Sequence, residues 1–411
     1  MITKYFQPGA LFSYRPYRNL WASTLISVIA ISGFPIVLAV AVLDAGASAT
    51  KLGIILAARI FAGVVLAPFA GVWVDRLPRK TVLVTADGFR ALLGTLVVFL
   101  PYNSSKIWLL AVIVFTMGVS DAFGSPASQA IMSSVLPPEK LLQGNTIRGI
   151  ASRTGTIVGP GIAGLLVITL GNRGSFAIIS VFFLIGATLL LRIEEGPRES
   201  TSGAETHYFT ELKKGFQIVW LHKWLAAMIA MATVQLMIVA GTENVLLPVI
   251  TKRQFHTASV FATSASLFSI GAGISALIAL KHQAKHRGQY SVLLWGVFAI
   301  APFVLAFPTH RWLIFLAYFI AGFSMGGWEA YWWTGVQQEI PQEYLGRVSS
   351  IDYMGTFGLL PIGMALAGPL SSYFGEKSFL ISVSIFHLVI CFLVLQVPGV
   401  KDMKSPHTIN D

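Results

Sequence analysis

The amino-acid sequence predicts an all-α membrane protein of about twelve transmembrane helices, arranged as two parallel six-helix halves. The first observation is composition: of 411 residues, 55% are hydrophobic and only 11% are charged, whereas a soluble domain carries about 25% charged residues. The second is a succession of apolar runs, each close to the roughly 20 residues that one helical crossing needs. The third is that features of the first half recur in the second.

The apolar runs are too long for the strands of a membrane barrel, which need about 9–11 residues each. Helices satisfy every backbone polar group within lipid, so each run is interpreted as a membrane-spanning helix. The predicted spans are residues 17–43, 50–74, 81–101, 107–135, 141–170, 174–193, 224–250, 258–280, 289–307, 312–339, 345–373 and 377–397.

The distribution of Lys and Arg predicts the orientation. Placing the N-terminus in the cytoplasm puts most of the basic residues that lie between the runs on the cytoplasmic side, as the positive-inside rule requires. An even number of crossings then returns the C-terminus to the same side. The net charge of +11 follows from this orientation, and no nucleic-acid partner is expected.

A polar segment divides the chain at its midpoint. Residues 194–222 are rich in Gly, Ser and Thr, and they are interpreted as a cytoplasmic linker between an N-terminal half, 1–193, and a C-terminal half, 223–411. A short amphipathic helix is predicted near 208–220. Parallel repeats indicate a transporter with its substrate site between the halves. The residues that recur at nearly constant spacing are Gly33 and Gly241, Gly63 and Gly271, Arg79 and Arg287, Gly118 and Gly326, and Asp121 and Glu329.

The stretch GVWVDRLPRK, residues 71–80, places an acid and three bases between two apolar runs. Its pattern resembles the loop G-x-x-x-D-R-x-G-R-K of the major facilitator superfamily, and the resemblance to this family covers essentially the whole chain. The matching residues are Gly71, Asp75, Arg76, Arg79 and Lys80, with Pro78 in place of a Gly. The resemblance implies a conformational latch between the halves, in which Asp75 faces the start of a helix that carries Arg347. The alternative, favoured for Arg76 and Lys80, is that the charges only fix orientation.

A second pattern resembles the antiporter motif G-x-x-x-G-P-x-x-G-G of drug:proton exporters in the same family. In GTIVGPGIAG the motif residues are Gly155, Gly159, Pro160 and Gly164, and Ala163 replaces one Gly. Small residues let membrane helices approach closely, and proline permits a kink. The segments PASQA and DGFRALL resemble the branch of macrolide and enterobactin exporters. The resemblance implies proton antiport in a bacterial cytoplasmic membrane.

Charged residues inside the predicted helices are candidates for function, because their burial in a membrane is costly. Asp87 and Arg90 are three residues apart on one helix and are expected to form a structural ion pair. A buried carboxyl group can bind and release a proton. Three acids on helices that line the cavity in the family are therefore the candidates for proton coupling: Asp121, Glu243 and Glu329. A permanent ion pair of Asp121 with Arg148, at a similar depth, is the alternative for the first of them.

The stretch GGWEAYWWTG, residues 326–335, is the candidate substrate contact. Glu329 lies beside Trp328 and Tyr331, and an acid near aromatic faces suits an amphipathic cation. Trp332 and Trp333 are interpreted as part of an interfacial aromatic belt. Buried arginines favour an anionic ligand such as a catecholate siderophore, and the candidates are Arg59, Arg148 and Arg153.

We therefore predict a secondary active transporter, not an enzyme, that exports an amphipathic small molecule by proton antiport and alternating access. The alternatives are an exporter of a siderophore or other metabolite, a lysophospholipid or lipid flippase, and a transporter-like sensor. The sequence has no G-x-x-x-x-G-K-[ST] loop for nucleotide-driven pumping. Its single cysteine, Cys391, allows no intrachain disulfide, and no metal or cofactor is expected. The expected partners are the substrate, protons and membrane lipid, and the chain is expected to act as a monomer.

Overall fold

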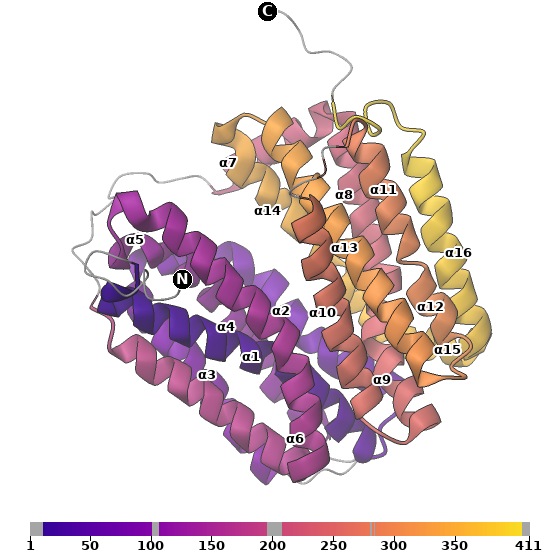
Figure 1. Ribbon diagram of the computed structural model, residues 1–411, viewed down its shortest axis with the longest axis horizontal. Coiled ribbons are helices and arrows are strands. Elements are labelled where there is room, and N and C mark those ends of the chain that lie inside the picture. Colours follow the sequence, from indigo (N-terminus) through magenta and orange to yellow (C-terminus); the bar gives the residue numbers. More distant parts are fainter. Residues whose placement is uncertain (1–10, 101–106, 195–207, 280–281, 283, 405–411) are drawn as a thin grey trace, which may run out of the picture. The chain divides into compact units, whose positions relative to one another are not determined.

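The computed structural model describes residues 11–100, 107–194, 208–279, 282 and 284–404 (Figure 1). These residues divide into two compact units. Unit 1 comprises the described parts of Met1–Ala47, Ala58–Thr201 and Phe261–Ser266, and unit 2 comprises those of Ser48–Ala57, Ser202–Val260 and Leu267–Asp411.

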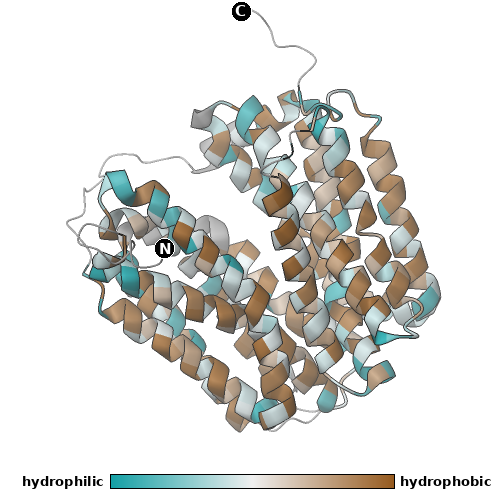
Figure 2. Cartoon of the chain, in the orientation of Figure 1, coloured by the Kyte–Doolittle hydropathy of each residue, from teal (hydrophilic) through white to brown (hydrophobic). Residues whose placement is uncertain are grey.

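Eleven helical stretches of the described chain are long and apolar enough to cross a membrane. One of them, Pro138–Leu191, is broken at Gly171, whose φ of 66° lies in the left-handed region that favours glycine. That stretch therefore supplies two of the predicted crossings. Figure 2 shows hydrophobic residues along most of the helices. The prediction of an all-α membrane protein is confirmed.

Unit 1 is built mainly from α1 and the helices that surround it. α1 packs along α6, and α3 packs against both α4 and α6. Phe34 of α1 and Phe176 of α6 are fully buried, with ring centroids 5.4 Å apart. The helices are α1 (Arg15–Asp44), α2 (Ala49–Arg76), α3 (Arg79–Phe99), α4 (Ile107–Ala130), α5 (Met132–Val135) and α6 (Leu141–Leu191), with short 3₁₀ turns η2 (Leu11–Ser13) and η3 (Pro138–Lys140).

Unit 2 contains most of the remaining helices. α9 packs against α15, α11 against α13, and α14 against both α7 and α8. The predicted linker lies partly outside the described residues, but its second part forms a helix at the predicted place. The helices are α7 (Tyr208–Leu221), α8 (Lys223–Gln235), the π-helix η4 (Leu236–Ala240), α9 (Gly241–Phe255), α10 (Ser259–Ala279), α11 (Arg287–Val297), α12 (Ile300–Leu305), α13 (Arg311–Glu339), α14 (Gln342–Gly358), α15 (Leu360–Phe374) and α16 (Glu376–Val394).

A column of aromatic side chains runs through the interior of unit 2. The ring of Trp332 contacts that of Trp224 at 6.1 Å between centroids and lies parallel to that of Trp328. Trp328 in turn contacts Trp295 at 5.0 Å. The predicted interfacial position of Trp332 is therefore wrong. Residues 328 and 332 are about one helical turn apart, so both face the interior.

A buried polar group lies at the end of this column. The amide of Gln235 donates from Nε2 to the backbone oxygen of His387 (3.1 Å) and to Sγ of Cys391 (3.3 Å). Trp295 donates its indole N–H to Oε1 of the same glutamine. Gln235 is the last residue of α8, directly before the π-helix. Its side chain therefore ties α16 to the point where the helix changes its winding.

Several predicted runs are interrupted rather than continuous. Pro302 lies in the first turn of α12 and Pro361 in the first turn of α15. Proline has no N–H to donate to the preceding turn, which accounts for a break before each. Hydropathy does not change at these breaks, so the sequence pattern did not reveal them. The interruptions lie at Ile131, at the π-helix Leu236–Ala240, at Phe298–Ala299 and at Leu359.

Candidate functional site

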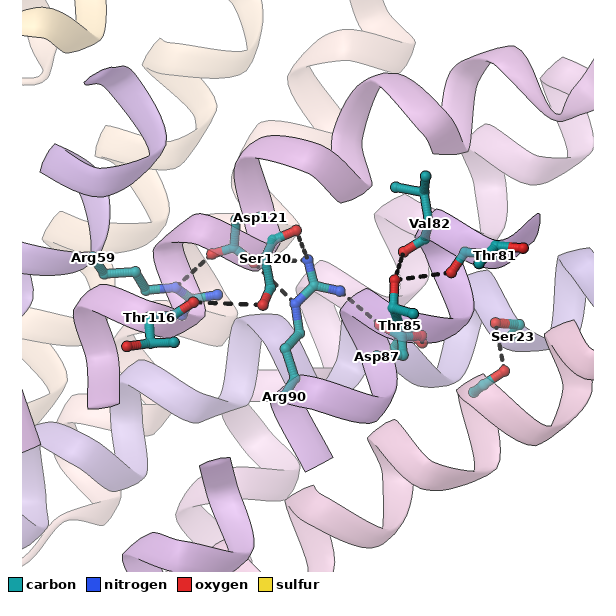
Figure 3. A network of polar contacts seen from close by, with 12 residues as sticks. Ser23, Arg59, Thr81, Val82, Thr85, Asp87, Arg90, Thr116, Ser120 and Asp121 are labelled. Carbon is teal, nitrogen blue, oxygen red and sulfur yellow. Dashed lines mark hydrogen bonds and ion pairs between the residues drawn. The ribbon is translucent and has the colours of Figure 1, made fainter. Parts of the chain in front are cut away.

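An ion-pair network lies at the centre of unit 1, and Asp121 of α4 is its hub (Figure 3). Oδ2 of Asp121 accepts a hydrogen bond from Nε of Arg59 on α2 at 2.7 Å. Oδ1 lies 2.9 Å from Nη2 of Arg90 on α3. One carboxylate thus joins three helices. Because both of its oxygens contact a guanidinium, the negative charge is compensated within the protein.

Arg90 extends the network to a second acid. Its Nη1 lies 2.6 Å from Oδ1 of Asp87, and both side chains are less than a tenth exposed. The pair expected from the three-residue spacing is therefore present. Oδ2 of Asp87 accepts a 2.6 Å hydrogen bond from Ser27 of α1, and Arg90 also donates to the backbone oxygen of Ser120 at 3.2 Å. The two aspartates and two arginines form a chain with no net charge.

Two glycines of α4 allow the backbone of α2 and the side chain of Arg90 to approach closely. Gly118 and Gly124 lie three residues before and after Asp121, so all three share one face of α4. A Cβ at Gly118 would lie 2.1 Å from the backbone oxygen of Arg59, and one at Gly124 would lie 3.1 Å from a guanidinium nitrogen of Arg90. The sequence reasoning missed the role of Gly124. The signal was present as the regular spacing of Gly, Asp and Gly.

A cavity of about 280 Å³ adjoins the network. Asp87, Arg90 and Asp121 line it together with hydroxyl groups of α1 and α4, and leucine, valine and isoleucine side chains form its remaining wall. The volume lies just below the range for small-molecule pockets, about 300–1,000 Å³. A wall that is polar on one side and apolar on the other can hold an amphipathic group.

The three predicted substrate-contacting arginines differ in position. Arg59 belongs to the network and stacks over the ring of Phe34 at 5.7 Å. Arg148 donates from Nη1 to the backbone oxygen (2.6 Å) and hydroxyl (2.8 Å) of Ser128. The alternative pair of Asp121 with Arg148 is therefore wrong. The last carbonyl groups of α4 are open acceptors, and Arg148 binds one of them instead. Arg153 is exposed.

Arg79 also binds the end of α4. It is the first residue of α3, and its Nη1 donates to the backbone oxygen of Ala130 (2.9 Å) and to the hydroxyl of Ser134 (3.2 Å). A cation at the C-terminus of a helix compensates the partial negative charge of its carbonyl groups. The sequence reasoning gave Arg79 a part in the latch or in orientation only. Within unit 1 it also caps a helix.

The other residues of the predicted latch are described only in part. Gly71, Asp75 and Arg76 lie in the last turns of α2, and the surroundings of these three residues lie outside what the structure describes. Lys80 is half-buried at the start of α3. The guanidinium of Arg347, on α14, stands 5.3 Å from the ring centroid of Tyr344. The latch stays a prediction.

The antiporter-motif glycines form a contact between helices. A Cβ at Gly155 would lie 2.8 Å from the side chain of Val28, and one at Gly159 would lie 2.7 Å from the backbone oxygen of Ile29. Both neighbours belong to α1, so the glycines allow α6 to approach it closely. A Cβ at Gly164 would likewise lie 2.3 Å from the Cβ of Ala262. Pro160 is buried between them.

Glu243, in the first turn of α9, has a different environment from Asp121. Its side chain is buried, and Tyr318 of α13 donates its hydroxyl hydrogen to Oε2. Oε1 has no hydrogen-bond partner within the described residues, and no Lys or Arg of that set pairs with the carboxyl group. A buried carboxylate normally needs a cation or several donors. Among the described residues one donor reaches this carboxyl group, and Glu243 lies three residues after the end of the π-helix.

Glu329 does not form the predicted aromatic site. The acid is exposed, whereas Trp328 and Tyr331 are buried. Tyr331 bonds to His282, with 2.8 Å between the hydroxyl and Nδ1. The prediction that these aromatic side chains surround Glu329 is therefore wrong. Adjacent helical residues point about 100° apart, so position 329 lies about 100° from position 328 and about 160° from position 331 around the helix.

Comparisons with known proteins agree with this architecture. The chain is 23% identical to macrolide efflux protein A of Streptococcus pyogenes over 399 residues, 95% of this chain and 96% of the relative. It is 25% identical to the multidrug efflux pump Tap of Mycolicibacterium fortuitum over 88% of this chain and 90% of the relative. The putative bacilysin exporter BacE of Bacillus subtilis (strain 168) is 31% identical, over 42% and 43% of the two chains.

Solved structures show the same fold. The nucleoside transporter NupG superimposes with a TM-score of 0.70 at 13% identity, covering 92% of this chain and 98% of that one. A bacterial homologue of the lysosomal transporter Spinster gives 0.70 at 14% identity, covering 93% and 95%. Residues 20–360 match the profile of a single family. The chain belongs to the Major Facilitator Superfamily and is a multi-pass membrane transporter rather than an enzyme.

Proposed function

We propose that this transporter exports an amphipathic, drug-like small molecule in exchange for protons. The two halves, 1–193 and 223–411, joined by the linker 194–222, would expose the substrate to each side of a bacterial cytoplasmic membrane in turn. Both termini would face the cytoplasm, and one chain would suffice. Support comes from relatives named as macrolide and multidrug efflux proteins that align over most of the chain.

The observation that carries proton coupling is the environment of Glu243. A proton carrier has to exist in both the charged and the neutral form during a cycle. A carboxyl group with no counter-charge within the described residues is neutralised by a proton rather than by an arginine. Glu243 meets this condition. Asp121 is held by two arginines, and the exposed side chain of Glu329 is in contact with solvent or lipid.

The charge balance of the unit 1 network supports a substrate that is not an anion. Arg59 and Arg90 already contact carboxylates, so an anionic ligand would have to displace one of them. Displacement would leave a buried aspartate without its cation, at a cost of about 3–5 kcal/mol. An uncharged or cationic amphipath avoids this cost. We therefore place the siderophore alternative second.

A metabolite exporter remains the second candidate function. Its support is the match to a putative bacilysin exporter, which has a higher identity than the drug pumps but covers less than half of the chain. Transport of a panel that contains both macrolides and bacilysin would separate the two. Uptake of bacilysin alone by inverted vesicles would favour the metabolite exporter.

The test of proton coupling uses the purified protein in proteoliposomes with a macrolide as substrate. Under an imposed pH gradient, Glu243→Gln should lose accumulation of the macrolide, because glutamine binds no exchangeable proton. Exchange of labelled for unlabelled macrolide without a gradient should persist. Glu329→Gln is the matched control, since it makes the same change at an exposed acid of the same unit.

The outcomes separate the candidate acids. Gradient-driven accumulation that survives in Glu243→Gln and disappears in Glu329→Gln or Asp121→Asn would assign the role of proton carrier to Glu329 or Asp121 and not to Glu243.

The latch has its own test. Asp75→Asn should slow transport without changing expression, and equal transport by the purified mutant and parent would contradict the latch.

A further inference from the structure

Unit 2 carries an apolar groove beside the π-helix. Its volume is about 460 Å³, and it lies between α15, α16, the π-helix η4 and the first turn of α9. One stripe of α15 forms a wall, with residues three, four or seven positions apart. α16 adds a second stripe between Ser378 and Phe386. The α15 residues are Gly363, Leu366, Ala367, Leu370 and Phe374.

The floor of the groove is closed by tight helix packing. A Cβ at Gly363 would lie 1.7 Å from the backbone oxygen of Met237, so α15 touches the π-helix there. Thr242 and Ala367 are almost fully buried. The floor is therefore a fixed surface of unit 2, and the groove is open on its outer side.

The open side faces the hydrocarbon of the membrane. Leu366 is 44% exposed and Phe374 is 59% exposed on the rim, and the neighbouring Ile385 is 57% exposed. α15 and α16 both belong to membrane-spanning stretches. Exposed apolar side chains on such helices contact lipid chains. The material that reaches the groove first is therefore an acyl chain.

The length of the groove agrees with such an occupant. Along α15, the distance from Gly363 to Phe374 is roughly 16 Å at about 1.5 Å per residue. Half of a hydrocarbon core of about 30 Å is roughly 15 Å. The groove thus extends over the depth of one leaflet. It begins at the α15–α16 turn, where Tyr373 is 83% exposed and charged residues follow, as at a membrane interface.

One lysine without a carboxylate partner among the described residues, Lys377, directly precedes a groove residue at the start of α16. Arg253 pairs with Glu376 at 2.5 Å, so these two charges balance. Lys377 is exposed beside the groove residue Ser378, and its ammonium lies 4.3 Å from the ring centroid of Phe307. A lysine at the headgroup level attracts the phosphate of an anionic lipid.

We propose that the groove is a binding site for an anionic phospholipid. One acyl chain lies between α15 and α16, and the phosphate group contacts Lys377. The lipid comes from the leaflet on the side of the α15–α16 turn. The site depends on the membrane-spanning fold and not on the identity of the transported molecule.

The test uses the full chain in vesicles of phosphatidylcholine and phosphatidylglycerol. The probe is a phosphatidylglycerol with a photoactivatable diazirine near the end of one acyl chain, and the cross-links are mapped by mass spectrometry. Peptides of α15 and α16 should carry several times more label than the lipid-facing residues of α4. Equal labelling of the two surfaces would overturn the proposal.

Two variants fill the groove, and one control does not. Ser382→Phe and Leu370→Phe place a larger side chain among the lining residues. Labelling of the α15 and α16 peptides should then fall to the level of the lipid-facing residues of α4, because exposed residues such as Leu366 and Phe374 still contact bulk lipid. Ile385→Phe adds similar bulk on the lipid-facing surface outside the groove and should label like the parent. Unchanged labelling in a folded groove variant would refute acyl-chain binding.

The headgroup has a separate readout. With matched phosphatidylcholine and phosphatidylglycerol probes, the parent should prefer the anionic lipid, and Lys377→Gln should remove that preference. A parent without preference would refute the role of Lys377. A groove labelled by a photoactivatable macrolide and by neither lipid would make it a substrate site and refute the proposal. Tryptophan fluorescence and size-exclusion profiles identify the folded variants.

Discussion

Arg90→Met tests whether the network of unit 1 stabilises the fold. The guanidinium contacts Asp87 and Asp121 and is less than a tenth exposed. Methionine keeps much of the length but leaves Asp87 with one hydroxyl donor. Removing one partner of a buried pair costs about 3–5 kcal/mol. For a unit of roughly 200 residues, this corresponds to a decrease in Tm of about 10 °C.

The assay is thermal unfolding of the purified protein in detergent, followed by tryptophan fluorescence. Arg59→Met should cost less, about 1–2 kcal/mol, because Asp121 keeps its contact with Arg90. Arg153→Met is the control, since the same change is made at an exposed arginine.

A second substitution tests the electrostatic cause. Asp87→Asn in the Arg90→Met background removes the buried charge that the first change leaves unpaired. The double variant should therefore recover about half of the lost stability. Equal Tm values for Arg90→Met and Arg153→Met would refute the reasoning. A further decrease on adding Asp87→Asn would also refute it.

Three more outcomes are expected. Gly159→Ala should lower thermal stability by about 1–3 kcal/mol through overpacking against α1, whereas Gly149→Ala, in the same helix with no heavy atom within 4 Å of the new methyl group, should be neutral; equal Tm values would contradict the close contact. Tyr318→Phe should change the pH dependence of transport by removing the donor that the described residues supply to Glu243, and an unchanged profile would show that the hydroxyl is irrelevant. Arg79→Ala should destabilise by about 1–2 kcal/mol, with partial rescue by Lys, because a cation leaves the end of α4; full stability of the Ala variant would rule out a capping role.

The features that could be predicted from the sequence are those set by the surrounding lipid and by the geometry of a single helix. Membrane-spanning segments follow from the need to keep apolar side chains in hydrocarbon, and the pairing of Asp87 with Arg90 follows from their spacing on one helix. The partner of Asp121 could not be found in this way. The sequence places arginines on three other helices, and it does not show which of them lies next to Asp121. Only the packing of α2 and α3 against α4 selects Arg59 and Arg90.

The partner of Glu243 also depended on information that hydropathy does not contain. The hydrogen bond between Glu243 and Tyr318 joins α9 to α13, and nothing in either segment indicates the other. The environment of Glu329 was within reach of the sequence. A helical projection would have separated it from Trp328 and Tyr331, which lie on the interior face.

The burial of Cys391 next to Gln235 has a practical consequence. It is the single cysteine of the chain, and its side chain is 6% exposed. Thiol reagents modify accessible thiolates, so the native protein should resist labelling. Cysteine pairs introduced at exposed positions of units 1 and 2 can then carry spin labels without removal of the native residue. Pulsed dipolar spectroscopy on such pairs would measure directly how far the units move during a transport cycle.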